Sequence, residues 1–424
     1  MKNKVLIGLL LVLIGGWGNL LAQKAGESYA RQVNTLIGTK GVGLTSGYLY
    51  PGATYPYGMV QFTPSYFSKR SGFVINQLSG GGCEHMGNFP TFPVKGKLKM
   101  SPDNILNYRI NISEEKGHAG YYEAMVQEDI KAKLTVTERT GMASYEYPAD
   151  QQYGTVIIGG GISATPIEQA AVVITAPNKC EGYAEGGNFC GLRTPYKVYF
   201  VAEFDTDALE LGTWKRDDLK PNTTFAEGEY SGVYFTFDVS KKKNIQYKIG
   251  VSYVSVENAR ENLKAENAGW DFLQIQNQAE SKWNHYLGKI EVEGSNPDRT
   301  TQFYTHLYRS FIHPNVCSDV NGEYMGADFK VHKSRSKHYT SFSNWDTYRT
   351  QIQLLAMLDP EVASDIVISH QLFAEEAGGA YPRWVMANIE TGVMQGDPTP
   401  ILISNAYAFG ARNYDPKPIF KIMR

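Results

Sequence analysis

The chain from residue 23 to about residue 260 alternates between short apolar stretches and turns. Polar or glycine-rich turns, such as residues 182–187 and Pro221-Asn222, separate stretches that are rich in β-branched and aromatic residues. Stretches of this kind predict strands. The clearest cover residues 135–147, 196–201, 232–239 and 245–256. Because these strands follow one another without an intervening helical pattern, we expect residues 23–260 to form a β-sandwich.

Residues 261–424 show a helical pattern instead. Apolar side chains recur at near-helical spacing, as at Phe303, Leu307 and Phe311. Asp359 followed by Pro360 is a typical helix start, because aspartate caps the first turn and proline fits its first position. Helices are predicted over residues 265–288, 300–312, 345–357, 361–375 and 399–410. Helices that alternate with polar, aromatic loops predict a helical toroid whose loops form one face.

The first 22 residues resemble a secretory signal peptide. Lys2 and Lys4 precede an apolar run over residues 5–16, and Leu20-Leu21-Ala22 before Gln23 fits a cleavage site. The run is short for a membrane span, and no later segment has the apolar length to cross a membrane. We therefore expect a secreted or periplasmic protein without a membrane anchor, in a compartment that permits disulfides.

Composition narrows the choice of partners. The formal net charge of the 424 residues is -2, which argues against a nucleic-acid partner. Aromatic residues make up 12%, with 28 Tyr, and this suits neutral ligands. Cys180 and Cys190 lie in one glycine-rich region, where a bridge and two free thiols are equally plausible. Cys83 and Cys317 are distant in sequence and can both be free, and no cysteine pair has zinc-like spacing with histidine.

The candidate chemistry gathers between residues 345 and 391. Trp345, Asp346 and Arg349 lie in one short segment, followed by Trp384 and then Glu390. Tryptophan offers an apolar face to a pyranose ring, while aspartate and arginine fix its hydroxyl groups. A nearby glutamate can protonate a departing glycosidic oxygen. These residue types together predict a sugar site.

Each candidate also has a plain structural interpretation. Asp346 and Arg349 are three apart on one helix face, so they can form a local ion pair worth about 0.3–0.5 kcal/mol. Glu390 can be a solvated surface group, and Trp345 and Trp384 can be core residues. The glycine-rich segment through Gly82 and Cys83 can be a simple turn, with Glu84 and His85 as possible sugar contacts. Asp319 near Asn321-Gly322 lacks the spacing of an EF-hand, so a turn is the better interpretation there.

Several segments, in order, resemble glycoside hydrolase family 92, the inverting, calcium-dependent exo-α-mannosidases. They are residues 33–39 (VNTLIGT), 51–61 (PGATYPYGMVQ), 78–83 (LSGGGC), 303–322, 342–349 (FSNWDTYR) and 388–396 (NIETGVMQG). The chain departs from the family at Asn388-Ile389, where Gly-Asn is usual, and at Ser71-Gly72-Phe73-Val74. The resemblance nevertheless covers nearly all of the chain after the signal peptide.

The resemblance implies an N-terminal β-sandwich, residues 23–260, packed on an (α/α)6 barrel that begins at residue 261. It implies an active site between them, with Glu390 as general acid and the loop of Gly82, Cys83 and Glu84 shaping the sugar pocket. In the family the catalytic base and most calcium ligands lie in a later motif that has no counterpart here. We therefore expect this chain to be C-terminally truncated, with an incomplete barrel, and inactive alone.

The main hypothesis is a secreted exo-α-mannosidase, of α-1,2 type, that removes terminal mannose from glycans with inversion and uses calcium. One alternative is a non-catalytic carbohydrate-binding protein. Another is a hydrolase of a different sugar on the same scaffold.

Overall fold

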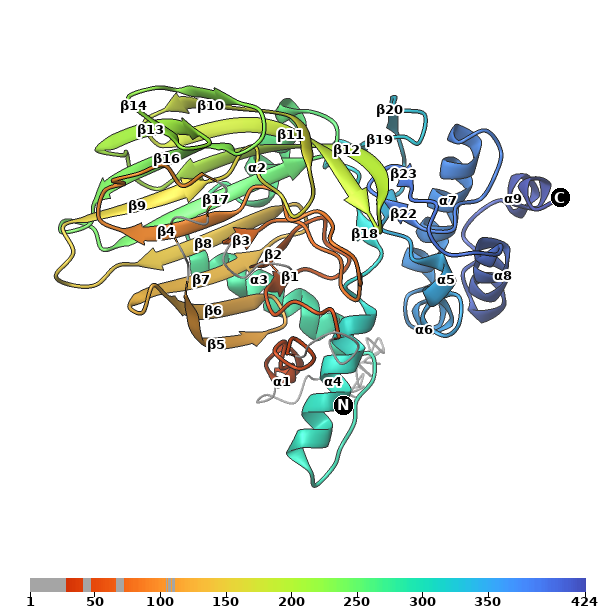
Figure 1. Ribbon diagram of the computed structural model, residues 1–424. Helices are drawn as coiled ribbons and strands as arrows, with labels where there is room; N and C mark the ends of the chain where they lie inside the picture. Colours follow the sequence, from red (N-terminus) through yellow and green to blue (C-terminus); the bar gives the residue numbers. More distant parts are fainter. Residues whose placement is uncertain (1–27, 41–46, 66–71, 104, 106–107, 109–110) are drawn as a thin grey trace, which may run out of the picture.

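The computed structural model describes residues 28–40, 47–65, 72–103, 105, 108 and 111–424. The expected signal peptide at residues 1–22 lies outside them. Two large antiparallel sheets form a sandwich, and helices follow beside it (Figure 1). We call residues 53–252 the sandwich and residues 256–424 the helical half. The predicted order of strands followed by helices is confirmed.

The first sheet has eight strands and carries both early and late segments of the sandwich. In spatial order they are β1 (Ala53–Thr54), β2 (Gln61–Pro64), β3 (Phe73–Val74), β4 (Thr91–Lys95), β9 (Tyr153–Ile158), β16 (Ser231–Asp238), β13 (Glu210–Lys215) and β14 (Asp218–Pro221). Strand β9 pairs with β4 on one side and with β16 on the other, so the middle of the sheet joins segments distant in sequence.

The second sheet has nine strands. In spatial order they are β15 (Phe225–Glu227), β10 (Ile167–Ala176), β11 (Lys179–Phe189), β12 (Leu192–Phe204), β17 (Asn244–Ser252), β8 (Thr140–Glu146), β7 (Ile130–Val136), β6 (Tyr121–Val126) and β5 (Ile112–His118). The predicted strand over residues 135–147 is wrong in one respect. It spans the end of β7, a turn at residues 137–139, and β8, which pair as a hairpin.

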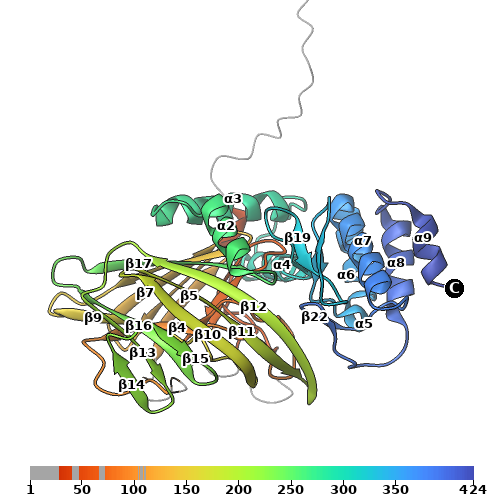
Figure 2. The same cartoon turned by 90° about the horizontal axis from the view of Figure 1, so that it is seen from above.

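Large aromatic and aliphatic side chains fill the space between the sheets. Phe204, for example, packs against Phe235 and Tyr247, with ring centroids 4.9 and 5.2 Å apart. The outer face of the second sheet is covered as well, because α2 (Val256–Glu266) lies on β12 and β17 and α3 (Phe272–Leu287) lies on β7 and β8 (Figure 2). Strands buried on both faces lose the alternation of apolar and polar residues, which explains their imperfect pattern in the sequence.

The predicted helix over residues 265–288 is two helices. Helix α2 ends at Glu266, and α3 begins after Asp271, whose side chain accepts a hydrogen bond from the Gln274 N–H at 3.0 Å. The break lets the two helices follow different strands. Ala259 and Leu263 of α2 pack on Val201.

The predicted helices over residues 300–312, 361–375 and 399–410 are confirmed with shifted ends, whereas the one predicted over 345–357 is two helices separated by a turn at residues 348–350. In chain order these helices are α4 (Pro297–Ser310), α5 (Asn344–Thr347) with α6 (Gln351–Leu358), α7 (Pro360–Glu376) and α8 (Pro398–Phe409), to which the structure adds α1 (Tyr29–Gln32) and α9 (Pro416–Ile422). Three two-stranded sheets lie in the connections: β18 (Asn315–Val316) with β21 (Tyr339–Thr340), β19 (Glu323–Met325) with β20 (Val331–Lys333), and β22 (Val385–Met386) with β23 (Ile389–Glu390).

The core of the helical half also takes in residues from the start of the chain. Ala30, Val33 and Tyr57 pack in the same apolar cluster as Trp283 and Tyr308. The Trp283 indole N–H donates to the Thr54 carbonyl oxygen at 2.7 Å, which ties β1 to α3. The predicted division at residue 260 is not tested by these contacts and stays a prediction.

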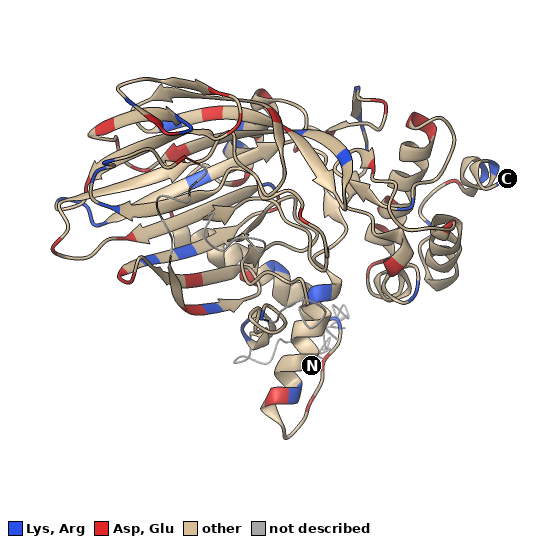
Figure 3. Ribbon diagram, viewed as in Figure 1, with Lys and Arg blue, Asp and Glu red and all other residues tan. Residues whose placement is uncertain are grey.

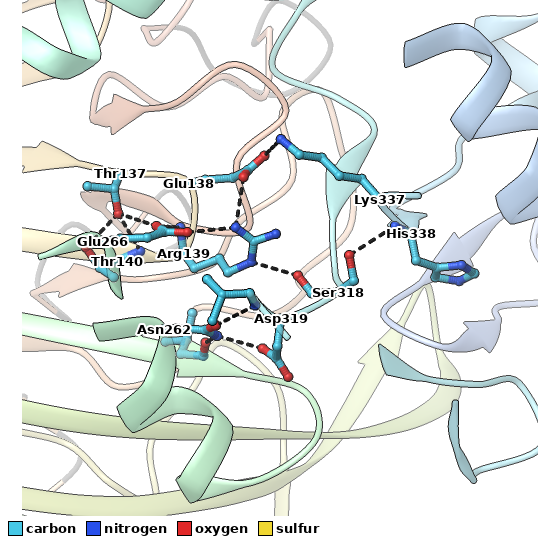
Figure 4. Close-up of polar contacts among 12 residues, drawn as sticks. Thr137, Glu138, Arg139, Thr140, Asn262, Glu266, Ser318, Asp319, Lys337 and His338 are labelled. Carbon is cyan, nitrogen blue, oxygen red and sulfur yellow. Dashed lines mark hydrogen bonds and ion pairs between the residues drawn. The ribbon is translucent and has the colours of Figure 1, made fainter. Parts of the chain in front are cut away.

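A buried polar network joins the sandwich to the helical half (Figure 4). Arg139, in the turn between β7 and β8, contacts Glu138 at 2.8 Å and Glu266 at 2.7 Å, and its Nε donates to the Ser318 carbonyl oxygen at 2.7 Å. Lys337 forms a second ion pair with Glu138. Burial opposes ionisation of Glu138, but the two cations outweigh it and lower the pKa of this carboxyl.

Asp319 is buried at the edge of the same network. Its carboxylate accepts hydrogen bonds from Ser252 at 2.7 Å, Asn258 at 2.8 Å and Asn262 at 2.6 Å. Burial raises the pKa of Asp319, and these hydrogen bonds offset part of that effect. The Gly322 N–H donates to the Asp319 carbonyl oxygen at 2.9 Å, so this segment is a turn, as predicted.

Acidic and basic residues are interspersed along the chain in both halves (Figure 3). Among the helices of the described residues, none combines the length and the apolar character needed to cross a membrane.

Candidate functional site

A cavity of about 690 Å³ lies where the sandwich meets the helical half. The sandwich contributes residues 78–83, which we call the glycine loop, together with Phe189 at the end of β11 and Cys190 in the turn that follows. The helical half contributes, among others, Arg309, His313, Asp346, His370, Trp384 and Met394. The volume suits a small organic ligand, and a mainly apolar wall with a few polar groups is typical of ligand pockets.

The disulfide of this chain is at the cavity wall. Cys83 of the glycine loop bonds to Cys190, 107 residues later, while Cys180 and Cys317 are free and buried. A bridge between Cys180 and Cys190 is therefore excluded, and the interpretation of Cys83 as a free thiol was wrong. Cys180 belongs to β11 and points into the core between the sheets, so it cannot reach Cys190 at the turn.

Asp346 is the clearest of the predicted site residues. It lies in α5, is exposed, and lines the cavity, with its carboxylate accepting a hydrogen bond from the Ser343 hydroxyl. Gly82 and Cys83 line the same cavity from the opposite half of the molecule. The structure thus brings together two predicted segments that are more than 260 residues apart. Glu84, next in sequence, is exposed and is not among the lining residues.

Trp345 and Arg349 are not among the cavity-lining residues. The Arg349 guanidinium lies over the ring of Trp345 at 4.6 Å and over that of Tyr348 at 4.9 Å. These contacts stabilise the segment by cation–π attraction. The local ion pair between Asp346 and Arg349 is not formed, since Asp346 instead accepts from Ser343.

Glu390 lies in β23, next to the cavity but not among its lining residues. One carboxylate oxygen accepts from the N–H groups of Arg383 at 2.7 Å and Trp384 at 3.2 Å, and the other accepts from that of Gly392 at 2.9 Å. In this arrangement Glu390 holds the hairpin of β22 and β23 in shape. Trp384, Val393 and Met394 on either side of it do line the cavity.

Several cavity residues were missed by the sequence analysis. Phe189 packs against Trp384 with ring centroids 4.5 Å apart, and it had no local signal because a phenylalanine at a strand end is unremarkable in sequence. His370 is buried in α7 and its Nε2 lies 3.0 Å from Asn344 Oδ1. His85, proposed as a sugar contact, is instead buried and bonded to the glycine loop.

Calcium was expected from the family resemblance. Within the part of the chain that the structure describes, no group of three or more His, Cys, Asp or Glu side chains is arranged to hold a metal ion. Near the cavity the described carboxylates are engaged elsewhere, with Asp346 bonded to Ser343 and Glu390 to backbone N–H groups. The described residues therefore do not fit a calcium site, and we derive no step through calcium.

Comparisons with known proteins point to one family. The glycosyl hydrolase family 92 N-terminal domain matches residues 32–252, and the family 92 catalytic domain matches residues 258–424. An uncharacterized secreted glycosidase of Arthroderma benhamiae is 26% identical over 363 residues, 76% of this chain and 45% of that protein.

Two solved structures share the fold closely. The family GH92 α-mannosidase BT3965 from Bacteroides thetaiotaomicron has a TM-score of 0.85 and 26% identity, covering 94% of this chain and 56% of that one. The inverting mannosidase BT2199 from the same organism has a TM-score of 0.84 and 26% identity, covering 94% and 55%. The chain thus spans about half the length of these relatives. Its predicted fold class, a β-sandwich followed by an incomplete (α/α)6 barrel, is confirmed, and the chain belongs to glycosyl hydrolase family 92.

Proposed function

We propose that the protein containing this chain is a secreted exo-α-mannosidase that removes terminal mannose from glycans with inversion. The observation that carries this proposal is the cavity between the two family domains, walled by the glycine loop on one side and Asp346 on the other. The similar BT3965 has been solved in complex with mannoimidazole, and BT2199 is described as an inverting mannosidase. The α-1,2 preference remains part of the proposal.

In this proposal each residue of the cavity wall has its own role in binding the sugar. Asp346 accepts hydrogen bonds from sugar hydroxyls, since its exposed carboxylate lines the cavity whereas Glu84 and Glu390 do not. Phe189 and Trp384, packed against each other, form part of the apolar wall of the cavity. The disulfide fixes the glycine loop opposite. Closing the sugar between two halves excludes water from all but the attacking position.

Glu390 is the proposed general acid. It would transfer its proton to the glycosidic oxygen as the bond to the anomeric carbon breaks, while water adds from the other side and loses a proton to a base. In the present structure its carboxylate accepts three backbone hydrogen bonds, so it must exchange at least one of them for the substrate oxygen. Catalytic hydrogen bonds often form only in the substrate complex. We propose that the base and the calcium ligands lie outside the described residues.

The same contacts of Glu390 favour a second candidate, a non-catalytic carbohydrate-binding protein. In that case Glu390 only shapes the hairpin, and the cavity binds mannose without chemistry.

One experiment separates the two. The 424-residue chain and the longest protein that its gene encodes are incubated with α-mannobiosides and calcium, and the anomer of released mannose is followed by proton NMR. The proposal expects the longer protein to release mannose first as the β-anomer, to prefer the α-1,2 linkage, and to lose activity with a chelator. Mannoside binding without release by either protein would establish the binding candidate. Neither binding nor release would refute both.

A further inference from the structure

The glycine loop begins with two neighbouring N–H groups that bond to two different histidines. The Leu78 N–H donates to His85 Nε2 at 2.9 Å, and the Ser79 N–H donates to His313 Nε2 at 2.8 Å. His85 lies just after the loop in the sandwich, whereas His313 follows α4 in the helical half. Consecutive backbone groups of one loop are therefore attached to both halves of the molecule.

The tautomer of each ring follows from its second nitrogen. His85 Nδ1 lies 2.7 Å from the Cys83 carbonyl oxygen, which can only accept, so Nδ1 carries the hydrogen and Nε2 is a bare acceptor. His313 Nδ1 lies 2.7 Å from Asn315 Oδ1. The Asn315 amide nitrogen already donates to two carbonyl oxygens, which identifies its Oδ1 as the acceptor. Both histidines are therefore neutral, and each accepts a loop N–H through Nε2.

The surroundings favour the neutral form of both rings. Burial lowers the pKa of His85 and of His313 to about 4. The charged or titratable groups that face His313 are Arg309 from α4 and His85 itself, and both disfavour a second positive charge. Glu84 follows Cys83 and precedes His85 in sequence, but it is exposed and is not among the causes of the lowered pKa of His85.

Two further contacts with described residues hold the rest of the loop. Gly80, Gly81 and Gly82 have no side chains to pack, so the position of this wall depends on backbone contacts and on its ends. The Gly80 N–H donates to the Tyr48 carbonyl oxygen at 2.9 Å, and Cys83 is fixed by its bond to Cys190. A β-carbon added at Gly81 would lie 2.8 Å from the His85 ring, so the loop also lies directly against that ring.

We propose that His85 and His313 are positioning residues of the cavity. From opposite halves of the molecule, they accept hydrogen bonds from two consecutive N–H groups of the glycine loop and so hold the loop in its ligand-binding position. The inference rests on the proposed function for the identity of the ligand. Holding a flexible wall in place before binding removes an ordering cost from the binding free energy. Protonation of either ring replaces its acceptor with a donor, so acid releases the loop.

The test compares leucine with glutamine at each position. His85→Leu and His313→Leu remove the acceptor, whereas His85→Gln and His313→Gln retain a side-chain oxygen at a similar reach. His306→Leu, on the exposed face of α4, is the matched control. The whole 424-residue chain is used for each variant. Amide hydrogen exchange at residues 78 and 79 and the affinity for mannoimidazole are measured between pH 4 and pH 7.5.

We expect His85→Leu to speed exchange at residue 78 and His313→Leu to speed it at residue 79, with the distant strands still protected. Each leucine variant should bind mannoimidazole about 5- to 10-fold more weakly, the factor for one ordinary hydrogen bond, and the glutamine variants should recover most of the affinity. In the unsubstituted chain, protection of both amides should fall together as the pH approaches 4.

Fast exchange at both amides in the unsubstituted chain, or unchanged affinity in both leucine variants, would overturn the inference. Equal losses in the leucine and glutamine variants would also overturn it, because they would show that ring packing and not the acceptor matters. A 424-residue chain that fails to bind mannoimidazole but shows selective loss of protection would support the anchoring of the loop and would show that the sugar site needs the longer protein.

Discussion

The rings of Phe189 and Trp384 pack against each other in a tilted arrangement, with centroids 4.5 Å apart and an interplanar angle of 30°. Phe189 ends β11 in the sandwich and Trp384 precedes β22 in the helical half, so this contact joins the two halves directly at the cavity wall. Both side chains are almost fully buried. The pair therefore serves stability and the shape of the site together.

Removing this contact should destabilise the protein measurably. We expect Phe189→Ala to cost about 3–5 kcal/mol, the usual range for a buried phenylalanine, and to lower the unfolding temperature. A double-mutant cycle with Trp384→Ala should give a coupling of about 0.5–1.5 kcal/mol for the rings themselves. Phe225→Ala, at a ring that is 54% exposed, is the control and should change little. Equal effects at Phe189 and Phe225 would contradict the structure.

The disulfide gives a chemical prediction. Thiol titration in denaturant without reductant should find two free thiols, Cys180 and Cys317, and peptide mapping should find Cys83 linked to Cys190. Replacing both bridged cysteines by serine should cost about 2–4 kcal/mol, because the unfolded chain gains freedom over a long loop. Cys317→Ala leaves the bridge intact and controls for cysteine replacement itself. A mapped bridge between Cys180 and Cys190 would refute the assignment.

Arg139 should be far more important than an exposed arginine. Arg139→Met removes the cation shared by the largely buried Glu138 and Glu266 and leaves the Lys337 ion pair with Glu138, and we expect a loss of about 3–5 kcal/mol. Denaturant unfolding measures the loss. Arg193→Met, which breaks an exposed ion pair with Glu168, is the matched control and should cost no more than about 1 kcal/mol. A small effect at Arg139 would show that the network contributes little.

The buried histidines should make the protein sensitive to acid. Burial lowers the pKa of His85, His313 and His370 to about 4 and that of His338 to about 3. Below pH 6.5 the unfolded chain binds protons that the native state refuses, so this stability is present above pH 6.5 and is lost as the pH falls toward 4. Each histidine contributes a slope of about 1.4 kcal/mol per pH unit in that window.

Two carboxyls, Asp319 and Asp365, work against this trend, because burial raises the pKa of each. Burial raises the pKa of Asp365 to about 6, so between pH 6 and pH 4 the native state holds a proton that the unfolded chain releases. The slope near pH 5, measured by denaturant unfolding at several pH values, should therefore be smaller than the histidines alone would give. His338→Phe keeps a ring stacked on Tyr324 and should reduce the slope by about one histidine. An unchanged slope in that variant would contradict the assignment.

Glu390→Gln tests the proposed acid in the longer protein. General acid catalysis is worth about 10²–10⁴-fold, so cleavage of natural mannobiosides should fall by that factor. An aryl mannoside with an acidic phenol leaves without protonation and should be affected much less. Glu375→Gln, at an exposed site on α7, should change neither rate. Equal losses on both substrates would show that Glu390 acts only by holding the hairpin of β22 and β23.

The sequence alone determined what depends on neighbouring residues. Asp359 and Pro360 predicted the start of α7, and the Asp359 carboxylate does accept a hydrogen bond from the Val362 N–H at 3.3 Å. The change from strands to helices near residue 260 and the six ordered family segments were also readable, because periodicity and motif order are properties of the chain itself. Breaks without glycine or proline were not readable, as in the turn at residues 137–139.

Only the tertiary structure decided what depends on distant partners. Cys83 could not be assigned to Cys190 from sequence, because these two residues are 107 positions apart and come together only in the folded structure. The sequence also could not tell which of Trp345 and Trp384 lines the cavity, because both are tryptophans in the same candidate region. Packing against Phe189 places Trp384 on the cavity wall, and stacking under Arg349 leaves Trp345 outside it. Which side of a segment faces a ligand is settled by long-range packing, and no local pattern encodes it.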